Sequence, residues 1–173
     1  METSWRFAAL SVLALISAAG CTQKAAAPPA EPVVAATDKI AAGRYLVKIG
    51  GCNDCHTGHY GERNGDVPEA DWLMGDAPGF NGPWGTSFPA NLRLSVQASD
   101  EDAWIAAMRS RKGLPPMPWP SISAMNEQDL RAIYQYIHSL GPKGVAAPAA
   151  LPPGQVPAGP YYYFMPVTGK PPG

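Results

Sequence analysis

Three stretches of the chain place apolar residues at the three- and four-residue spacing of an amphipathic helix. The spacing predicts helices over residues 38–50, 99–111 and 126–140. The apolar stripe of the third stretch consists of Leu130, Ile133, Tyr134 and Ile137. No stretch alternates with the two-residue period of a strand, so the pattern favours an all-α domain.

Polar residues at the ends of the later two stretches fit helix termini. Ser99 is a candidate N-cap, with Asp102 completing a capping box, and Asn126 is the candidate N-cap of the third stretch. Gly141 and Pro142 then end that helix, because glycine suits the residue after a helix and proline cannot continue it.

The interval 57–94 is rich in glycine and has little periodicity. A loop of this length without elements of its own is uncommon in a compact domain unless it has a function. The interval is explained if it wraps a large bound group that supplies the missing core.

Composition narrows the class of protein. A length of 173 residues suits one domain, and the formal net charge of −1 leaves no basic surplus for phosphates, which argues against nucleic-acid binding. Three cysteines do not make a disulfide scaffold.

The N-terminal region has the pattern of an export signal. Arg6 precedes a short apolar stretch that ends in small residues before Cys21, which predicts a signal peptide over residues 1–20 rather than a membrane-spanning helix. The stretch resembles the lipobox of bacterial lipoproteins, in which the cysteine becomes the lipid-modified first residue. Lipidation of Cys21 would anchor the protein to a membrane, and the alternative is cleavage after Ala19 to give a soluble protein.

The segments on either side of the domain differ from it in composition. Residues 21–37 are rich in alanine and proline and predict a tether, and residues 143–173 predict a disordered, proline-rich tail around a domain at 38–142. Within the tail, Tyr161–Phe164 is an apolar strip that either packs back on the domain or docks a partner.

Residues 52–56 read Cys-Asn-Asp-Cys-His, the attachment pattern of c-type haem. The thiols of Cys52 and Cys55 bond the two vinyl groups at one haem edge, and the imidazole of His56 then reaches the iron. The other uses of such a pattern are a zinc site, for which only His59 is near, and a thioredoxin-type redox pair, which needs a βαβ context. A disulfide across two intervening residues would be strained.

Together with its surroundings, this motif resembles class I c-type cytochromes over residues 38–142. The similar parts are Ala41–Val47 before the motif, the segment Leu114–Trp119, and Asn126–Leu140 at the end. The resemblance implies a small all-α cytochrome c fold with about three main helices around one covalent haem c. It also implies that the first and last helices cross, with Gly43 and Val47 against Tyr134 and Ile137.

In this family a methionine is the second axial ligand, and Met117 is the candidate here. It lies between Pro116 and Pro118, which fix the backbone around it. Met74 and Met125 are the alternatives, whereas Met108 lies on a helical stripe and is expected in the core.

Residues around the haem are less well defined by sequence. The resemblance suggests a proline carbonyl as acceptor for the axial imidazole, and Pro68 is either that residue or an ordinary loop proline. Four side chains are candidates for contact with the haem propionates, or are ordinary surface or core residues: Trp84, Asn91, Arg93 and Trp119.

Ligation by His56 and Met117 fills both axial positions of the iron, which suits electron transfer rather than catalysis. The resemblance therefore implies a non-enzymatic carrier of one electron between redox partner proteins, a donor dehydrogenase and an acceptor oxidase or reductase. It would lie on the periplasmic side of a bacterial membrane, with the outer membrane favoured by Thr22 after Cys21. The alternatives are an electron-transfer subunit of a membrane dehydrogenase or oxidase complex, and a haem sensor or enzyme with an open distal site.

Overall fold

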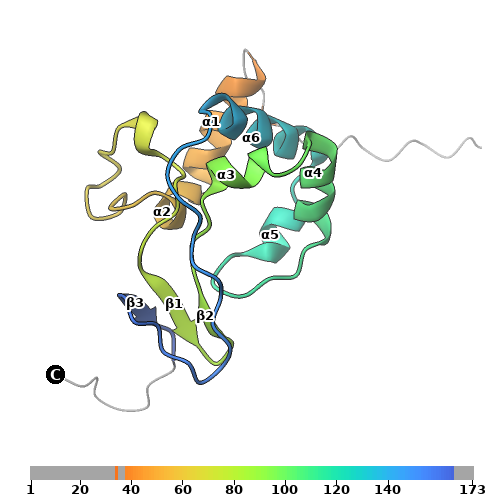
Figure 1. Cartoon of the computed structure of the whole chain (residues 1–173). Coiled ribbons are helices and arrows are strands. Elements are labelled where there is room, and N and C mark those ends of the chain that lie inside the picture. Colours follow the sequence, from red (N-terminus) through yellow and green to blue (C-terminus); the bar gives the residue numbers. More distant parts are fainter. Residues whose placement is uncertain (1–33, 35–37, 166–173) are drawn as a thin grey trace, which may run out of the picture. The chain divides into compact units, whose positions relative to one another are not determined.

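The structure is a computed structural model that describes residue 34 and residues 38–165. The helices in this part of the chain are α1 (Lys39–Ile49), α2 (Cys52–His56), α3 (Leu92–Gln97), α4 (Glu101–Ser110), α5 (Trp119–Ser123) and α6 (Glu127–Ser139). A 3₁₀ turn, η1 (Glu69–Asp71), lies between α2 and the strands β1 (Gly79–Gly82), β2 (Gly85–Ser87) and β3 (Tyr161–Tyr163). Figure 1 shows the helices together in its upper part and the strands below them.

The three strands make the prediction of an all-α fold wrong. β1 and β2 form an antiparallel hairpin, and β3 joins the other side of β1 in parallel, in the order β2-β1-β3. Each strand has only three or four residues, which is too short for a two-residue alternation to stand out in the sequence. The described domain is therefore a helical unit with a small mixed sheet.

The region predicted as a disordered tail is ordered over its described part, so that expectation is also wrong. We call residues 141–165 the C-terminal strap. In Figure 1 it runs from the end of α6 down to the hairpin. Leu151 and Thr86 exchange backbone hydrogen bonds of 2.9 Å in both directions, and the carbonyl of Gln155 accepts from Nδ2 of Asn81 at 3.2 Å.

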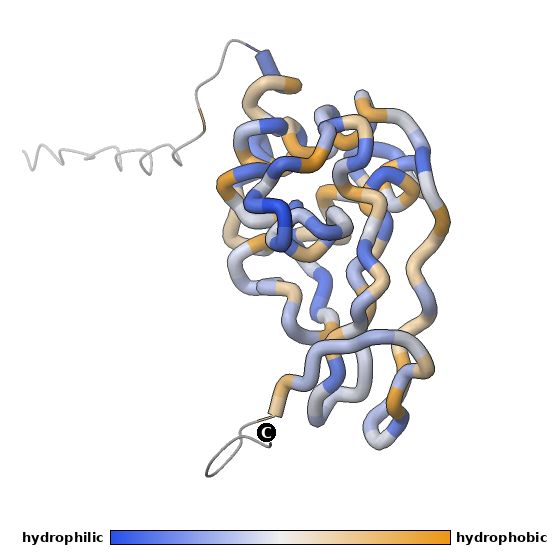
Figure 2. Tube along the Cα trace, turned by 90° about the vertical axis from the view of Figure 1, so that its left-hand side faces the viewer, coloured by the Kyte–Doolittle hydropathy of each residue, from blue (hydrophilic) through white to orange (hydrophobic). Residues whose placement is uncertain are grey.

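The strip Tyr161–Phe164 packs back on the hairpin, as one of its two interpretations predicted. Tyr162 stacks on Phe80 with ring centroids 5.4 Å apart, and Phe164 contacts Phe80 and Trp84. The strip nevertheless stays largely exposed on its outer side, with Tyr163 at 64% exposure. Figure 2 shows that the described chain ends in a hydrophobic stretch, far from the helices that hold most of the core.

The core lies where α1 crosses α6. The fully buried side chains include Val47 on α1 and Leu130, Tyr136 and Ile137 on α6. The crossing was predicted correctly at Gly43, but the backbone nearest to it belongs to Ala132 and the nearest side chain to Tyr136, not to Tyr134 and Ile137.

The three predicted helices are present with slightly shorter bounds. Asn126 caps α6 as expected, accepting from the backbone N–H of Asp129 at 2.9 Å. The N-cap of α4 is Asp100 rather than Ser99, because the Asp100 carboxylate accepts from the N–H of Ala103 at 2.8 Å. The short helices α2, α3 and α5 carry too few residues for a periodic signal.

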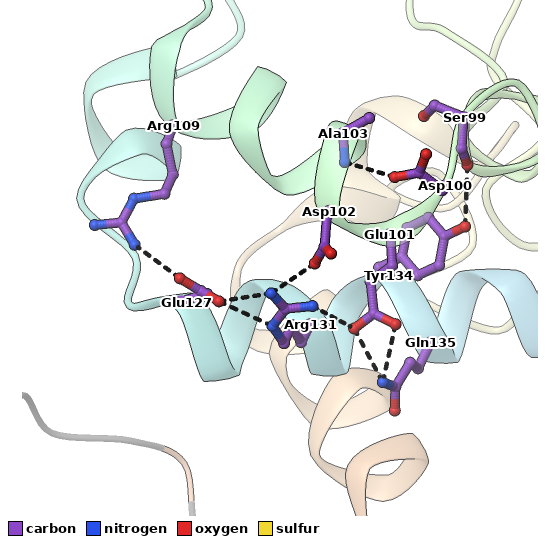
Figure 3. A network of polar contacts seen from close by, with 10 residues as sticks. All are labelled: Ser99, Asp100, Glu101, Asp102, Ala103, Arg109, Glu127, Arg131, Tyr134 and Gln135. Carbon is purple, nitrogen blue, oxygen red and sulfur yellow. Dashed lines mark hydrogen bonds and ion pairs between the residues drawn. The ribbon is translucent and has the colours of Figure 1, made fainter.

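A network of charged groups fixes α4 on α6 (Figure 3). The guanidinium of Arg131 on α6 contacts Glu101 and Asp102 on α4 at 3.3 and 2.7 Å, and Glu127 on its own helix at 2.6 Å. The amide of Gln135 also donates to Glu101, at 3.0 Å. Since α4 leads into the segment that carries Met117, this network holds one end of that segment in place.

The glycine-rich interval 57–94 contributes to the core itself. Trp72 and Leu73 are 4% and 0% exposed, and the indole N–H of Trp72 donates to the carbonyl of Val67 at 2.8 Å. The expectation that this interval has no elements or core of its own is therefore wrong, since it holds η1, the hairpin and the start of α3.

The predicted signal peptide (1–20), the lipidation site Cys21 and the tether (21–37) lie outside the described residues, apart from Val34. Within the described ranges, no helix combines the length and hydropathy that crossing a membrane requires.

Candidate haem-binding site

The Cys-x-x-Cys-His motif forms a single helical turn, α2. Gly51 precedes it with a φ of 68°, a left-handed conformation that glycine adopts without strain. This residue lies in the turn between α1 and α2. Cys52 and Cys55 are free and half-buried, and His56 at the end of the turn is 8% exposed.

Hydrogen bonds attach α2 to the glycine-rich interval that follows it. The hydroxyl of Thr57 donates to the side-chain carbonyl of Asn53 at 2.8 Å and accepts from the backbone N–H of Leu73 at 2.8 Å. The N–H of Gly75 donates to the carbonyl of His56 at 2.8 Å. The position of His56 is therefore fixed on its backbone side.

The imidazole of His56 is oriented by one backbone acceptor. Its Nδ1 lies 2.7 Å from the carbonyl oxygen of Ala90. Burial lowers the pKa of His56, and the bond to Ala90 opposes that effect only in part. The ring is therefore neutral near pH 7, with the proton on Nδ1, and Nε2 presents a free lone pair to a metal.

Pro68 does not accept this hydrogen bond. Its carbonyl instead accepts from the backbone N–H of Asp71 at 2.8 Å, at the start of η1. The interpretation of Pro68 as an ordinary loop proline is confirmed. Sequence reasoning missed Ala90, because a backbone carbonyl leaves no signature in the residue type.

Burial also determines the protonation state of the thiols of Cys52 and Cys55. Desolvation raises the pKa of Cys52 to about 11, and desolvation together with Asp54 and Asp76 raises the pKa of Cys55. Both cysteines are therefore protonated thiols near neutral pH. A thiol–disulfide redox pair requires a thiolate of lowered pKa, so the site does not favour that use of the motif.

A zinc site receives no support either. The described part of the chain has no group of three or more histidine, cysteine or acidic side chains that could hold a metal ion. His59, the additional ligand considered, is 69% exposed and is paired with Glu62 at 2.7 Å.

Met117 lies in the segment between α4 and α5 and is half-buried. Its carbonyl accepts from the N–H of Trp119 at 2.9 Å, and the hydroxyl of Ser87 donates to the carbonyl of Pro115. Ser87 is three residues before Ala90, and Pro115 is two residues before Met117. This contact therefore ties the Met117 segment to the chain that leads to Ala90, the hydrogen-bond partner of His56.

Three of the other described methionines have packing contacts, and the fourth, Met165, is exposed at the end of the C-terminal strap. Met108 is buried in the core, and Met125 packs against the core from its edge. Met74 lies beneath the C-terminal strap, with its sulfur 3.6 Å from the position of a Cβ on Gly144. These placements favour Met117 as the methionine available to a bound group.

The four side chains considered for the haem propionates separate into two pairs. Asn91 and Arg93 already donate hydrogen bonds to backbone carbonyls of the protein. Arg93 donates to Ala70, Leu140 and Gly141. Asn91 donates to Lys143 and Val145. The indole N–H groups of Trp84 and Trp119 are buried without a hydrogen-bond partner in the described structure. Buried donors are almost always paired, so these two N–H groups require an acceptor that the described chain does not supply.

Taken together, these residues fit a covalent haem. Two protonated thiols lie on one helical turn, and the neutral imidazole at its end keeps Nε2 free. No family model, curated protein or solved structure matches this chain.

Proposed function

We propose that the protein is a single-haem c-type cytochrome that carries one electron between redox partner proteins and catalyses no reaction itself. The observation that supports this best is the motif Cys52–His56 on one turn, with Nδ1 of the buried His56 held 2.7 Å from the carbonyl of Ala90. An imidazole oriented by its second nitrogen is the usual state of a metal-ligating histidine.

In this proposal Cys52 and Cys55 would hold the haem covalently, and Nε2 of His56 and the sulfur of Met117 would be the ligands of its iron. The bound haem iron supplies reversible one-electron oxidation and reduction. The chain fixes the imidazole through Ala90, and the prolines on both sides of Met117 restrict its backbone. With both residues as ligands the iron would have no open place for substrate or oxygen, which suits electron transfer rather than catalysis.

The remaining histidines do not suggest a reactive group beside the haem. His59 is paired with Glu62 on the surface, and His138 is exposed and stacks on Tyr134 with ring centroids 5.8 Å apart. An enzyme or sensor with an open distal site is therefore the weaker interpretation.

We place the protein on the periplasmic side of a bacterial membrane, lipid-anchored through Cys21, with a soluble periplasmic protein as the alternative. Partners would be a donor dehydrogenase and an acceptor oxidase or reductase. A stable place in a membrane dehydrogenase or oxidase complex is a second candidate. The strip Tyr161–Phe164 and the adjacent Met165 favour this second candidate, because these five residues are each at least 40% exposed. Apolar surface of this kind often marks a protein contact.

The test is the optical spectrum of the full chain made in a host that attaches haem to exported proteins. We expect a low-spin spectrum, a methionine–iron charge-transfer band in the oxidised form, and no change when carbon monoxide is added to the reduced form. Haem should remain on the denatured polypeptide and be lost when both Cys52 and Cys55 are changed to alanine. A chain without covalent haem would refute the proposal, and ready carbon monoxide binding would favour the sensor or enzyme.

A further inference from the structure

Asn91 joins the C-terminal strap to the backbone that holds His56. It is 4% exposed, and its amide Nδ2 donates to the carbonyls of Lys143 at 2.7 Å and Val145 at 3.1 Å. Its Oδ1 accepts from the N–H of Leu94 at 3.1 Å and so caps α3. Both ends of one short side chain are therefore fixed, one to the strap and one to α3.

The acceptor of the His56 bond belongs to the same peptide group as Asn91. The carbonyl of Ala90 and the N–H of Asn91 share one plane because the peptide bond is planar. A side chain held at both ends restricts the rotation of its own backbone, and through that plane the direction of the Ala90 carbonyl.

The same peptide is confined from the other side. A Cβ on Gly75 would lie 2.8 Å from the carbonyl oxygen of Pro89 and 3.2 Å from the backbone nitrogen of Asn91. Gly75 also donates to the carbonyl of His56. The peptide group between Ala90 and Asn91 thus lies between Gly75 on one side and the C-terminal strap on the other.

The strap comes unusually close at Gly144. This residue has a φ of 79°, and a Cβ there would lie 3.0 Å from Nδ2 of Asn91 and 3.4 Å from Cβ of Met74. Only glycine combines that backbone conformation with such close packing.

We propose that Asn91 is a positioning residue through which the C-terminal strap holds the Ala90 carbonyl against Nδ1 of His56 and thereby sets the reduction potential. The inference rests on the proposed function, since it concerns an axial histidine. A hydrogen bond from Nδ1–H makes the imidazole a stronger donor to the metal and stabilises the oxidised state. Loosening the Ala90 carbonyl weakens that bond and raises the potential.

Two variants test this from opposite sides of the contact. Asn91→Ser keeps an N-cap for α3 but is too short to reach the strap. Gly144→Ala displaces the Asn91 amide from the strap side and leaves the cap residue unchanged. In the haem-loaded full chain, both should raise the midpoint potential and make the Nδ1 proton of His56 exchange with solvent several-fold faster by NMR.

Each variant has a matched control. Asn81→Ser removes another amide donor to the strap, the one to Gln155, at a site that does not involve Ala90. Gly154→Ala introduces the same left-handed strain in the strap, at a φ of 84°, with no neighbouring atom within 4 Å of the added carbon. Both controls should keep the wild-type potential and exchange rate.

Unchanged potential and exchange in Asn91→Ser and Gly144→Ala would overturn the inference, as would equal shifts in the controls, since a general loosening would then explain them. Absence of covalent haem from the wild-type chain would instead overturn the proposed function, and the inference with it. The two failures are distinguished because the second shows in the wild-type spectrum and the first only in the variants.

Discussion

A Cβ atom on Gly43 would lie 2.0 Å from the carbonyl oxygen of Ala132. At this point α1 and α6 therefore meet backbone to backbone, and no side chain separates them. The approach allows Val47 and Ile137 to be buried completely on either side of it. The turn α2, the candidate haem-binding motif, follows α1 directly, so its position depends on this crossing.

Gly43→Ala should destabilise the fold by about 3 kcal/mol, at the upper end of the cost of overpacking, because the neighbour is backbone and cannot rotate away. The gain in helix propensity, about 1 kcal/mol, does not offset this. Urea unfolding followed by circular dichroism measures the difference. Gly61→Ala is the control, since no atom lies within 4 Å of its added carbon, and equal stabilities of the two variants would contradict the packing argument.

Met117→Ala should leave the haem covalently attached, lower the reduction potential and let carbon monoxide bind the reduced form. The reason is that an axial methionine raises the potential and closes the distal position. Redox titration and the carbon monoxide difference spectrum report these effects. Met125→Leu, which changes a methionine packed at the edge of the core, should alter neither. A Met117→Ala protein with the native spectrum would exclude Met117 as a ligand.

Glu69 should make stability depend on pH in the acid range. Desolvation acts to raise the pKa of its carboxyl, but hydrogen bonds from Arg44 and Tyr136, each 2.8 Å long, outweigh it and hold the pKa below its ordinary value of 4.5. A lowered pKa stabilises the fold above the unfolded value, and that contribution is lost as the pH falls through the folded value.

The measurement is the free energy of unfolding of wild-type protein and Glu69→Gln between pH 3 and pH 7. At neutral pH the variant should be less stable by under about 1 kcal/mol, because the pair with Arg44 is partly exposed. The difference should shrink below pH 4.5. Glu62→Gln, at a carboxylate that is 71% exposed, should cost little stability at neutral pH, and a pH-independent difference for Glu69→Gln would contradict the assignment.

Cys21→Ala should release the protein from membranes if Cys21 is the lipidated residue, because the signal can then be removed without attachment of acyl chains. Fractionation of the producing cells, with mass spectrometry of the mature N-terminus, shows the outcome. A correctly processed variant that stays with the membrane fraction would refute the lipid anchor.

Features that depend on neighbours in sequence could be predicted well. The apolar spacing places α1, α4 and α6 to within two residues, the cap Asn126 of α6 is correct while that of α4 is Asp100 rather than Ser99, and Gly43 could be identified as the crossing point of α1 and α6. The motif Cys52–His56 could be identified because its chemistry lies within five consecutive residues.

Features that depend on distant parts of the chain could not be predicted from the sequence. β1 acquires its parallel partner from Tyr161–Tyr163, and no local pattern in either segment indicates that pairing. The acceptor of the His56 bond is a backbone carbonyl 34 residues further along, and any residue type carries one. The proline content of the strap suggested disorder, but it excludes only helix, and an extended segment held through its backbone carbonyls tolerates it.

The position of the strap in the sequence also determines when the structure can be completed during synthesis. Synthesis runs from the N-terminus, and the carbonyl of Gln155 comes 74 residues after Asn81, the side chain that it pairs with. The hairpin therefore emerges without its third strand, while the two cysteines of α2 have long since left the ribosome. A chain that ends before Leu151 lacks the pairing with Thr86 and β3 altogether. The strap residues that complete the sheet are thus translated about a hundred residues after the motif Cys52–His56.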